Sequence, residues 1–213
     1  MPNWCDCQLK VSGPRADVEK FKHAVACPDD CVVFRINNLF PTPDSLVEVS
    51  AGSDESSYVV LYGSDAEYDT FVKLYKIVAA SRDDALAEYS KLCMRPVEEL
   101  RSKADAYCRN VEEFGHRHWY SWRIANWGTK WDVTESSIVK SYDSDDDKVM
   151  VYRFNSAWSP PTPALSKIST MFPTLSFKLR YFEGGCGFKG IFMVRDGVVI
   201  KDMTSDYSGN RGG

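Results

Sequence analysis

Hydrophobic and polar residues alternate with a period of two near the start of the chain. In residues 5–13, "CDCQLKVSG", every second side chain is apolar, which predicts a β-strand with one buried face. The following segment, residues 14–27, places Val18, Phe21 and Val25 three and four residues apart, which is typical of an amphipathic helix. The chain is therefore expected to open with a strand followed by a helix.

Two short apolar runs follow in the chain, and after them comes a longer segment with helical spacing. Residues 31–40, "CVVFRINNLF", and 56–64, "SSYVVLYGS", are rich in β-branched and aromatic residues and predict short strands. Residues 65–114 shift to Ala, Glu, Lys, Leu and Tyr with apolar steps of three and four, which predicts a helical insertion. Its last helix has Pro96 near the start and Gly115 just past the end. The apolar positions of that helix are Val97, Leu100, Ala104, Tyr107, Val111 and Phe114.

Strand-like segments return after Gly115. Five are predicted, at residues 119–127, 148–158, 175–183, 189–197 and 198–203. A short helix is predicted at residues 162–173, between the second and third of these strands. The dipeptide Asp196-Gly197 favours the type I′ turn of a β-hairpin. The acidic run at 141–148, "SYDSDDDK", is interpreted as a solvated loop.

The order of these elements predicts an α+β fold with an antiparallel sheet and helices on one face. Residues 1–64 would form the first part of the sheet domain, 65–114 the helical insertion, and 115–205 the second part of the sheet domain with its terminal hairpin. The last residues, 206–213, are polar and rich in glycine, so a flexible tail is predicted there.

Composition narrows the functional classes. The net charge is -4 and the sequence pI is about 5.5, so nucleic acid would have to be bound by a local patch, because the whole chain is not cationic. The apolar runs are too short to span a bilayer and the start lacks the features of a signal peptide, which predicts a cytoplasmic protein without a membrane partner. Seven cysteines, an odd number, are expected to be reduced, and neither a metal nor a cofactor is predicted.

Several motifs together resemble the Api92-like/YubB family. They are "MPNWC" at the start, Leu9, Val11 and Gly13, "FPTP" at 40–43, "WYSWRIANWGTKWD" at 119–132, and the later "AWSPP". The resemblance implies a ferredoxin-like fold for the sheet domain and a setting in phages, plasmids and bacterial genomes, and hence in a bacterial cytoplasm. It implies no activity and no catalytic residues.

The motif "NWGTKWD" is the main candidate binding site. Its two tryptophans flank a Gly-Thr-Lys turn, and they either seal the edge of the core or stack on a flat ligand while Lys130 attracts an anion. A nucleotide or single-stranded nucleic acid is the ligand that such an aromatic and basic site predicts. The candidate ligand-binding residues are Arg123, Asn126, Trp127, Thr129, Lys130, Trp131 and Trp158.

Catalytic signatures are weak. Cys186 with His116 or His118 would make a thiol-imidazole pair, and Glu183 with Asp132 or Asp196 a carboxylate pair, but the sequence does not bring either pair together. The glycine-rich run at 182–190 lacks the spacing of a phosphate-binding loop. The sequence therefore predicts a non-enzymatic accessory protein that binds a nucleotide-like or nucleic-acid ligand in counter-defence or host takeover. The alternatives are a module that captures a host protein and a small hydrolase-type enzyme.

Overall fold

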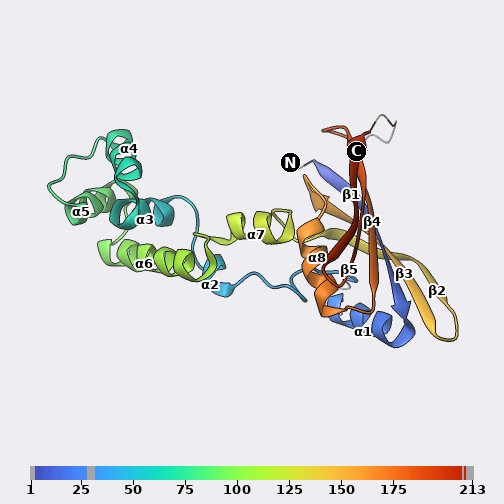
Figure 1. The fold of residues 1–213 in the computed structure, drawn as a ribbon. Helices are drawn as coiled ribbons and strands as arrows, with labels where there is room; N and C mark the ends of the chain where they lie inside the picture. The colour runs from blue at the N-terminus through green and yellow to red at the C-terminus, as the bar shows by residue number, and fades with distance from the viewer. Residues whose placement is uncertain (1–2, 28–31, 208, 210–213) are drawn as a thin grey trace. The chain divides into compact units, whose positions relative to one another are not determined.

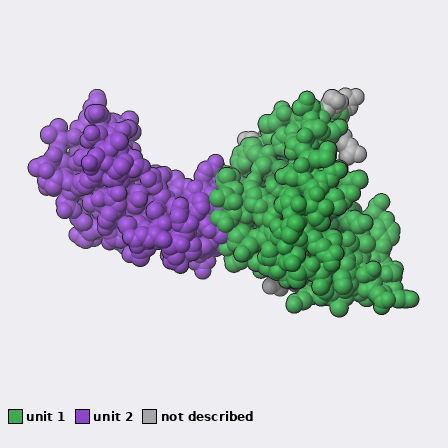
Figure 2. All heavy atoms as spheres, in the orientation of Figure 1, with its two compact units in different colours: residues 1–41, 123–213 green, residues 42–122 purple. Residues whose placement is uncertain are grey.

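The fold of this chain is given by a computed structural model that describes residues 3–27, 32–207 and 209. The chain divides into two compact units, which Figure 2 shows in different colours. Unit 1 comprises residues 1–41 and 123–213, and unit 2 comprises residues 42–122. The helical unit thus extends beyond both ends of the predicted insertion, 65–114.

Unit 1 is built on an antiparallel sheet of six strands in the order β2-β3-β1-β4-β5-β6. The strands are β1 (Trp4–Pro14), β2 (Thr134–Asp143), β3 (Asp147–Ala157), β4 (Ser176–Glu183), β5 (Phe188–Arg195) and β6 (Val198–Asp206). Helix α1 (Arg15–Val25) follows β1, and α8 (Thr162–Met171) joins β3 to β4. The resulting β-α-β-β-α-β order, with β5 and β6 added as a hairpin, confirms the predicted ferredoxin-like α+β fold.

Helices α1 and α8 lie on the same side of the sheet (Figure 1). On β1 the side chains of Cys5, Cys7, Leu9 and Val11 are buried against them, as the alternation predicts. Phe21 of α1 packs edge-on against several aromatic rings of the sheet and of the loop after α8. The residues between the buried positions of β1 point to the opposite face of the sheet, which we call the open face.

The predicted strand at 31–40 is wrong. Cys31 lies outside the described residues, and in residues 32–40 the only strand-like pairing is a single bridge between Val32 and Cys27. Phe34 and Ile36 are fully buried, so the apolar residues of this segment do belong to the core although they form no strand. Some backbone N–H groups of this segment find side-chain acceptors in place of a neighbouring strand. Those of Ile36 and Asn37 donate to the carboxylate of Asp132.

The predicted strand at 119–127 is a helix, α7 (Trp119–Trp127). The imidazole of His118 accepts a hydrogen bond from the N–H of Tyr120, which satisfies a donor in the first turn. Gly128, with a φ of 78°, ends the helix, and its N–H donates to the carbonyl groups of Arg123 and Ile124. Aromatic and β-branched residues favour strands in general, but here helix ends and burial outweigh that preference.

Strand β2 is present in the structure but was not predicted, because its sequence is largely polar. Every described side chain of β2 except that of Ser136 is exposed, so no alternation of apolar and polar residues marks it. Part of the acidic run that was interpreted as a loop belongs to the β2-β3 hairpin, and its turn is closed by the N–H of Ser144 donating to the carbonyl of Asp147. At the other end of the sheet, Asp196 and Gly197 have φ values of 48° and 73°, as the predicted type I′ turn requires.

Unit 2 is helical. It contains α2 (Asp44–Val47), α3 (Ser53–Tyr62), α4 (Asp65–Tyr75), α5 (Arg82–Cys93), α6 (Val97–Phe114) and the first residues of α7. The strand predicted at 56–64 is wrong, because most of it lies in α3, where Asp54, Ser57 and Val60 are buried at helical spacing. The regular helix that ends before Gly115 is confirmed. No helix in the described residues is long and apolar enough to cross a membrane.

Of the predicted flexible tail, Asp206 is the last residue of β6, and Tyr207 donates its N–H to the carbonyl of Gly187. Residues 208 and 210–213 lie outside the described part of the chain.

Candidate functional site

Two of the predicted ligand-binding residues lie in the core of unit 1. Trp127 is fully buried, and its indole Nε1 donates to the carbonyl of Phe40 over 2.9 Å. Thr129 is also fully buried, and its hydroxyl donates to the carbonyl of Ala157 over 3.0 Å. These contacts tie the end of α7 to the segment after α1 and to the end of β3. Neither side chain presents a surface to solvent.

Arg123 and Asn126 are half-buried on α7. The guanidinium of Arg123 lies 4.7 Å from the centre of the Trp127 ring, as a cation–π pair does. Burial lowers the pKa of Arg123, and the charge of Asp132 partly opposes that shift. Arg123 therefore covers the buried indole, so its position has a structural explanation.

The other three predicted residues do gather at the surface. The ring centres of Trp131 and Trp158 are 5.2 Å apart, and Nζ of Lys130 lies 5.0 Å from the first and 5.7 Å from the second. Trp4 joins them, with its ring centre 6.4 Å from that of Trp131. We call Trp4, Trp131 and Trp158 the tryptophan cluster. The sequence analysis did not predict Trp4 as a site residue. The alternation of the first strand could have indicated it, because a residue next to the buried Cys5 projects from the opposite face of the sheet.

Cationic side chains gather on the open face of the sheet. Strand register places Gln8 between Arg153 and Arg180, and the next row places Lys10 between Val151 and Lys178. Side chains directly opposite one another in an antiparallel pair project from the same face, so these rows share the open face. A third row holds Asp6, Phe182 and Lys189. We call the seven cationic residues of these three rows the basic face: Lys10, Lys140, Arg153, Lys178, Arg180, Lys189 and Lys201.

One carboxylate, that of Asp6, lies within the three rows that hold the basic face in the described sheet. It pairs with Arg153, and its hydrogen bond raises the pKa of that guanidinium. At the rim, Glu135 accepts a hydrogen bond from the amide of Asn155. Most of the cations in these rows thus have no carboxylate neighbour on the same face among the residues that the structure describes, which leaves a positive field there.

Two hollows run across this face. The first, of about 630 Å³, is lined among others by Gln8, Arg153, Arg180, Phe182 and Lys189. The second, of about 360 Å³, is lined among others by Lys10, Lys140, Tyr142 and Lys178. Gln8, Lys140 and Arg180 border both, so the hollows adjoin.

Aromatic side chains flank the hollows. Phe182 stacks on Tyr207 with ring centres 5.0 Å apart at an interplanar angle of 27°. Tyr142 stands 58% exposed at the edge of the second hollow. The sheet thus offers flat rings beside positive charge, a combination suited to bases and phosphates.

The carboxylates that sequence reasoning considered for catalysis are occupied by backbone donors. Glu183 is buried and accepts the N–H groups of Gly185 and Cys186. Burial raises the pKa of Glu183, but these backbone hydrogen bonds outweigh it and lower the pKa below the usual value. Asp132 accepts N–H groups from Ile36, Asn37 and its neighbour in the chain. Both carboxylates therefore hold loops in place.

Cysteine and histidine residues form no evident centre in the described part of the chain. Cys5 and Cys7 are buried free thiols beside Ser156, and burial raises the pKa of Cys7. No group of three or more potential metal ligands was found among the described residues. Cys186 belongs to unit 1, whereas His116 and His118 belong to unit 2.

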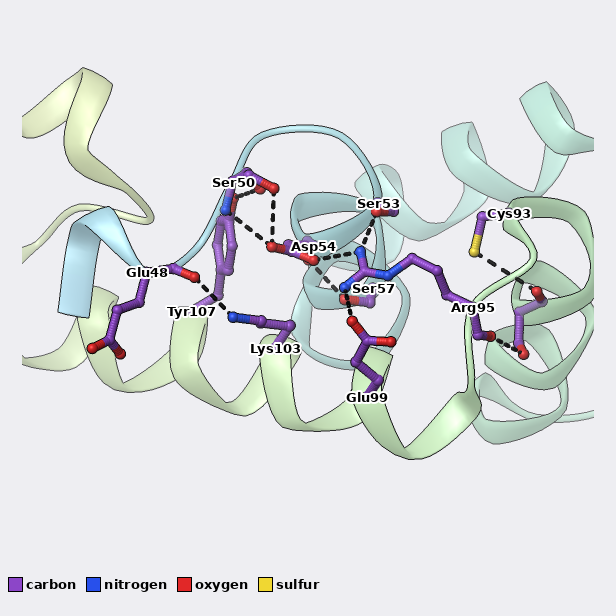
Figure 3. Close-up of polar contacts among 11 residues, drawn as sticks. Glu48, Ser50, Ser53, Asp54, Ser57, Cys93, Arg95, Glu99, Lys103 and Tyr107 are labelled. Atoms are coloured by element: carbon purple, nitrogen blue, oxygen red, sulfur yellow. Dashed lines mark hydrogen bonds and ion pairs between the residues drawn. The ribbon is translucent and has the colours of Figure 1, made fainter.

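Unit 2 contains a second cluster of charged groups, shown in Figure 3. Asp54 is 3% exposed and accepts the N–H and hydroxyl of Ser50, each over 3.0 Å. Arg95 bridges Asp54 at 2.6 Å and Glu99 at 2.7 Å. The hydroxyl of Tyr107 donates to the carbonyl of Ser50. These contacts join the start of α3 to α6 and to Arg95, two residues before α6 begins.

Comparison with known proteins gives a family for the second part of the chain. Residues 127–211 match the family described as the ferredoxin-like domain in Api92-like protein, and this range contains β2 to β6 and α8. A solved structure of a protein api92 from Yersinia pseudotuberculosis is 11% identical over 100% of both chains, with a TM-score of 0.47. No curated protein matches the chain.

Proposed function

We propose that this chain, whose residues 127–211 match the ferredoxin-like domain in Api92-like protein, binds single-stranded nucleic acid on the basic face. The match over these residues supports the resemblance found in the sequence, whereas the ligand is inferred from the charges and rings of the sheet. The observation that carries the proposal is the gathering of seven cations around one carboxylate in a chain whose net charge is -4.

The charge distribution favours a polyanion. Lys and Arg side chains neutralise phosphates and release condensed counterions, which gives affinity without regard to sequence. The basic face extends across all six strands, from Lys140 on β2 to Lys201 on β6. Neighbouring strands lie about 4.8 Å apart, so five steps span about 24 Å. A ligand with several phosphates would therefore contact more of this face than a single nucleotide.

The aromatic rings favour unpaired bases. Phe182, Tyr207 and Tyr142 lie beside the hollows, and a base can stack on such a ring only when its own face is accessible. The bases of a duplex are stacked on one another, so a duplex would use the charges and not the rings. In the phage or plasmid setting that the resemblance implies, such binding would serve an accessory role in counter-defence or host takeover.

The proposal is tested with labelled single-stranded DNA and RNA of about 20 nucleotides and one sequence, titrated by fluorescence anisotropy at several salt concentrations. The test variant is Lys178→Ala with Arg180→Ala, and the matched control is Lys20→Ala with Lys167→Ala. The control makes the same change in charge at exposed positions of α1 and α8.

We expect the Lys178→Ala/Arg180→Ala variant to bind at least about tenfold more weakly at low salt, and the control to change less than about twofold. Losing two phosphate contacts should also lower the slope of log affinity against log salt by about 1.4. Equal losses in both variants would overturn the assignment to the basic face. Absence of binding to DNA and RNA would overturn the function and favour a protein partner.

A further inference from the structure

We infer that the tryptophan cluster, together with Lys130, is a stacking site for an unpaired base of the strand that the basic face holds. This inference rests on the proposed function and adds to it a place where bases, rather than phosphates, are recognised. It assigns Trp4, Trp131, Trp158 and Lys130 to that site, and it leaves Trp127 and Thr129 as core residues.

Exposure of the rings is the first observation. Trp4 and Trp158 are 40% and 41% exposed, and Trp131, half-buried, lies in contact distance of both. Two large exposed indoles at one place form an apolar surface that a soluble protein usually covers with a ligand or partner. Indole rings have the breadth to stack on any of the four bases, so this surface fits a base of unspecified sequence.

Charge at the cluster is the second observation. Nζ of Lys130 lies over the rings of Trp131 and Trp158, so a positive charge is held next to the aromatic surface. A nucleotide that stacked on the indoles would bring its phosphate near such a charge. An apolar peptide segment would gain little from it.

Continuity with the basic face is the third observation. Trp4 precedes Asp6 by two residues in a regularly paired strand, so both side chains project from the open face. Asp6 lies in the row that also holds Phe182 and Lys189. A nucleic-acid strand that crosses the basic face along this row would therefore pass beside the tryptophan cluster, because Trp4 lies one row nearer the sheet end where β1 begins and β3 ends.

The backbone of Trp158 is the fourth observation. Its φ is 65°, in the left-handed region that bulky residues rarely adopt and glycine adopts easily. The N–H of Trp158 donates to the carbonyl of Asn3 over 2.9 Å, which helps to hold this conformation. An exposed tryptophan at a position suited to glycine indicates that its ring is retained for something other than backbone stability.

The same backbone gives a sharp variant, Trp158→Gly. If the ring only sealed the end of the sheet, its removal should lower the melting temperature. If the ring serves binding, glycine should relieve the strained conformation and leave the melting temperature equal or higher. We expect the second result by differential scanning fluorimetry. Trp4→Leu keeps apolar bulk and removes the indole, and Trp119→Phe, in unit 2, is the control for loss of a tryptophan.

Binding is measured with two single-stranded DNA probes of equal length, one carrying bases and one abasic throughout. Both present the same phosphates, so the ratio of their dissociation constants isolates the contribution of the bases. We expect the wild type to prefer the base-bearing probe by at least about tenfold, since stacking on one ring changes affinity by about five- to 150-fold. Trp158→Gly and Trp4→Leu should each reduce this ratio at least about fivefold. Their affinity for the abasic probe should stay unchanged.

The outcomes separate the inference from the function on which it rests. A ratio that both variants leave unchanged, with the fold intact, would overturn the stacking site while the basic face still binds the abasic probe. A ratio that Trp119→Phe reduces as strongly would also overturn it. Absence of binding to both probes would instead overturn the proposed function.

Discussion

Units 1 and 2 differ in where their charged side chains gather. Unit 1 buries an aromatic and aliphatic core, with Phe21, Phe34 and Tyr152 in mutual ring contact, and gathers seven of its cations on the open face. Unit 2 has an apolar cluster around Phe71 and Leu86, and beside it the buried carboxylate of Asp54 is paired with the guanidinium of Arg95. Unit 1 also buries a carboxylate, that of Glu183, but backbone N–H groups satisfy it and no cation is paired with it in the described structure.

The difference follows from the geometry of the two kinds of element. A sheet covered by helices on one side exposes every second side chain of its strands on the other, so charges there accumulate side by side without being buried. Small helices expose a large fraction of their surface, and polar networks can complete an interior that has few apolar residues. The cations available to a ligand are therefore expected on the open face of unit 1, whereas the ion pair of Asp54 and Arg95 serves the folding of unit 2.

The net charge of the whole chain hides this contrast. Unit 1 has 17 Lys and Arg against 15 Asp and Glu, whereas unit 2 has 9 against 15. The acidic character of the protein thus comes from the helical unit. An argument from the overall charge against nucleic-acid binding does not apply to the sheet.

The largest effect is expected from a substitution in the core of unit 1. Trp127→Ala removes a fully buried indole that also donates to Phe40, so we expect the free energy of unfolding of unit 1 to fall by about 3 to 5 kcal/mol. Amide hydrogen exchange, resolved by mass spectrometry, should show the loss of protection in unit 1 and not in unit 2. Trp127→Phe is the matched control, because it keeps an aromatic ring and should lose less. Equal loss in both units would show that they unfold together and would remove the contrast.

A somewhat smaller effect tests the charge buried in unit 2. Arg95→Ala leaves the carboxylate of Asp54 with only its bonds from Ser50, and breaking a buried ion pair from one side costs about 3 kcal/mol. Loss of hydrogen-exchange protection should be concentrated in α3 and α6. The control is Arg101→Ala, whose ion pair with Asp83 is exposed and should contribute less than about 1 kcal/mol. Equal effects of the two variants would mean that the Asp54 network does not stabilise unit 2 as an interior.

The smallest effect is a pH dependence. Burial raises the pKa of Asp54, but hydrogen bonds from Ser50 and Arg95 outweigh it, and the folded-state pKa lies below the usual value of about 3.9. The stabilisation is therefore complete above the unfolded-state pKa and is lost as the pH falls through the folded-state pKa. We expect hydrogen-exchange protection of unit 2 to decline on acidification, and to decline less steeply in Asp54→Asn. Identical pH profiles for the two proteins would contradict this role of Asp54.

Local pattern was sufficient where one element carried its own signals. Pro96 and Gly115 bracketed a helix that the structure places at Val97–Phe114, and Asp196-Gly197 marked the hairpin between β5 and β6. Alternation in the first strand correctly separated its buried from its exposed side chains. Each of these features depends on contacts within a few residues, so neighbouring residues determine it.

Local pattern failed where distant contacts outweighed local preference. Residues 119–127 contain three tryptophans and resemble a strand in sequence, but they form α7, in which Trp122 is buried in unit 2 and Trp127 in unit 1. Polar β2 forms an edge strand because β3 supplies its hydrogen-bond partners, which its own sequence does not reveal. The segment around Phe34 is held by Asp132, almost a hundred residues away in the chain.

The sequence by itself determined the antiparallel α+β class, the helix that ends before Gly115 and the presence of an aromatic motif around Lys130. Only the tertiary structure decided which of those aromatic residues reach solvent, because Trp127 and Trp131 are four residues apart and yet one is in the core and the other in the tryptophan cluster. It also decided the basic face, whose residues are scattered from Lys10 to Lys201. Cations far apart in the chain become one surface only when strand order and register set them in adjacent rows, and no local pattern encodes that neighbourhood.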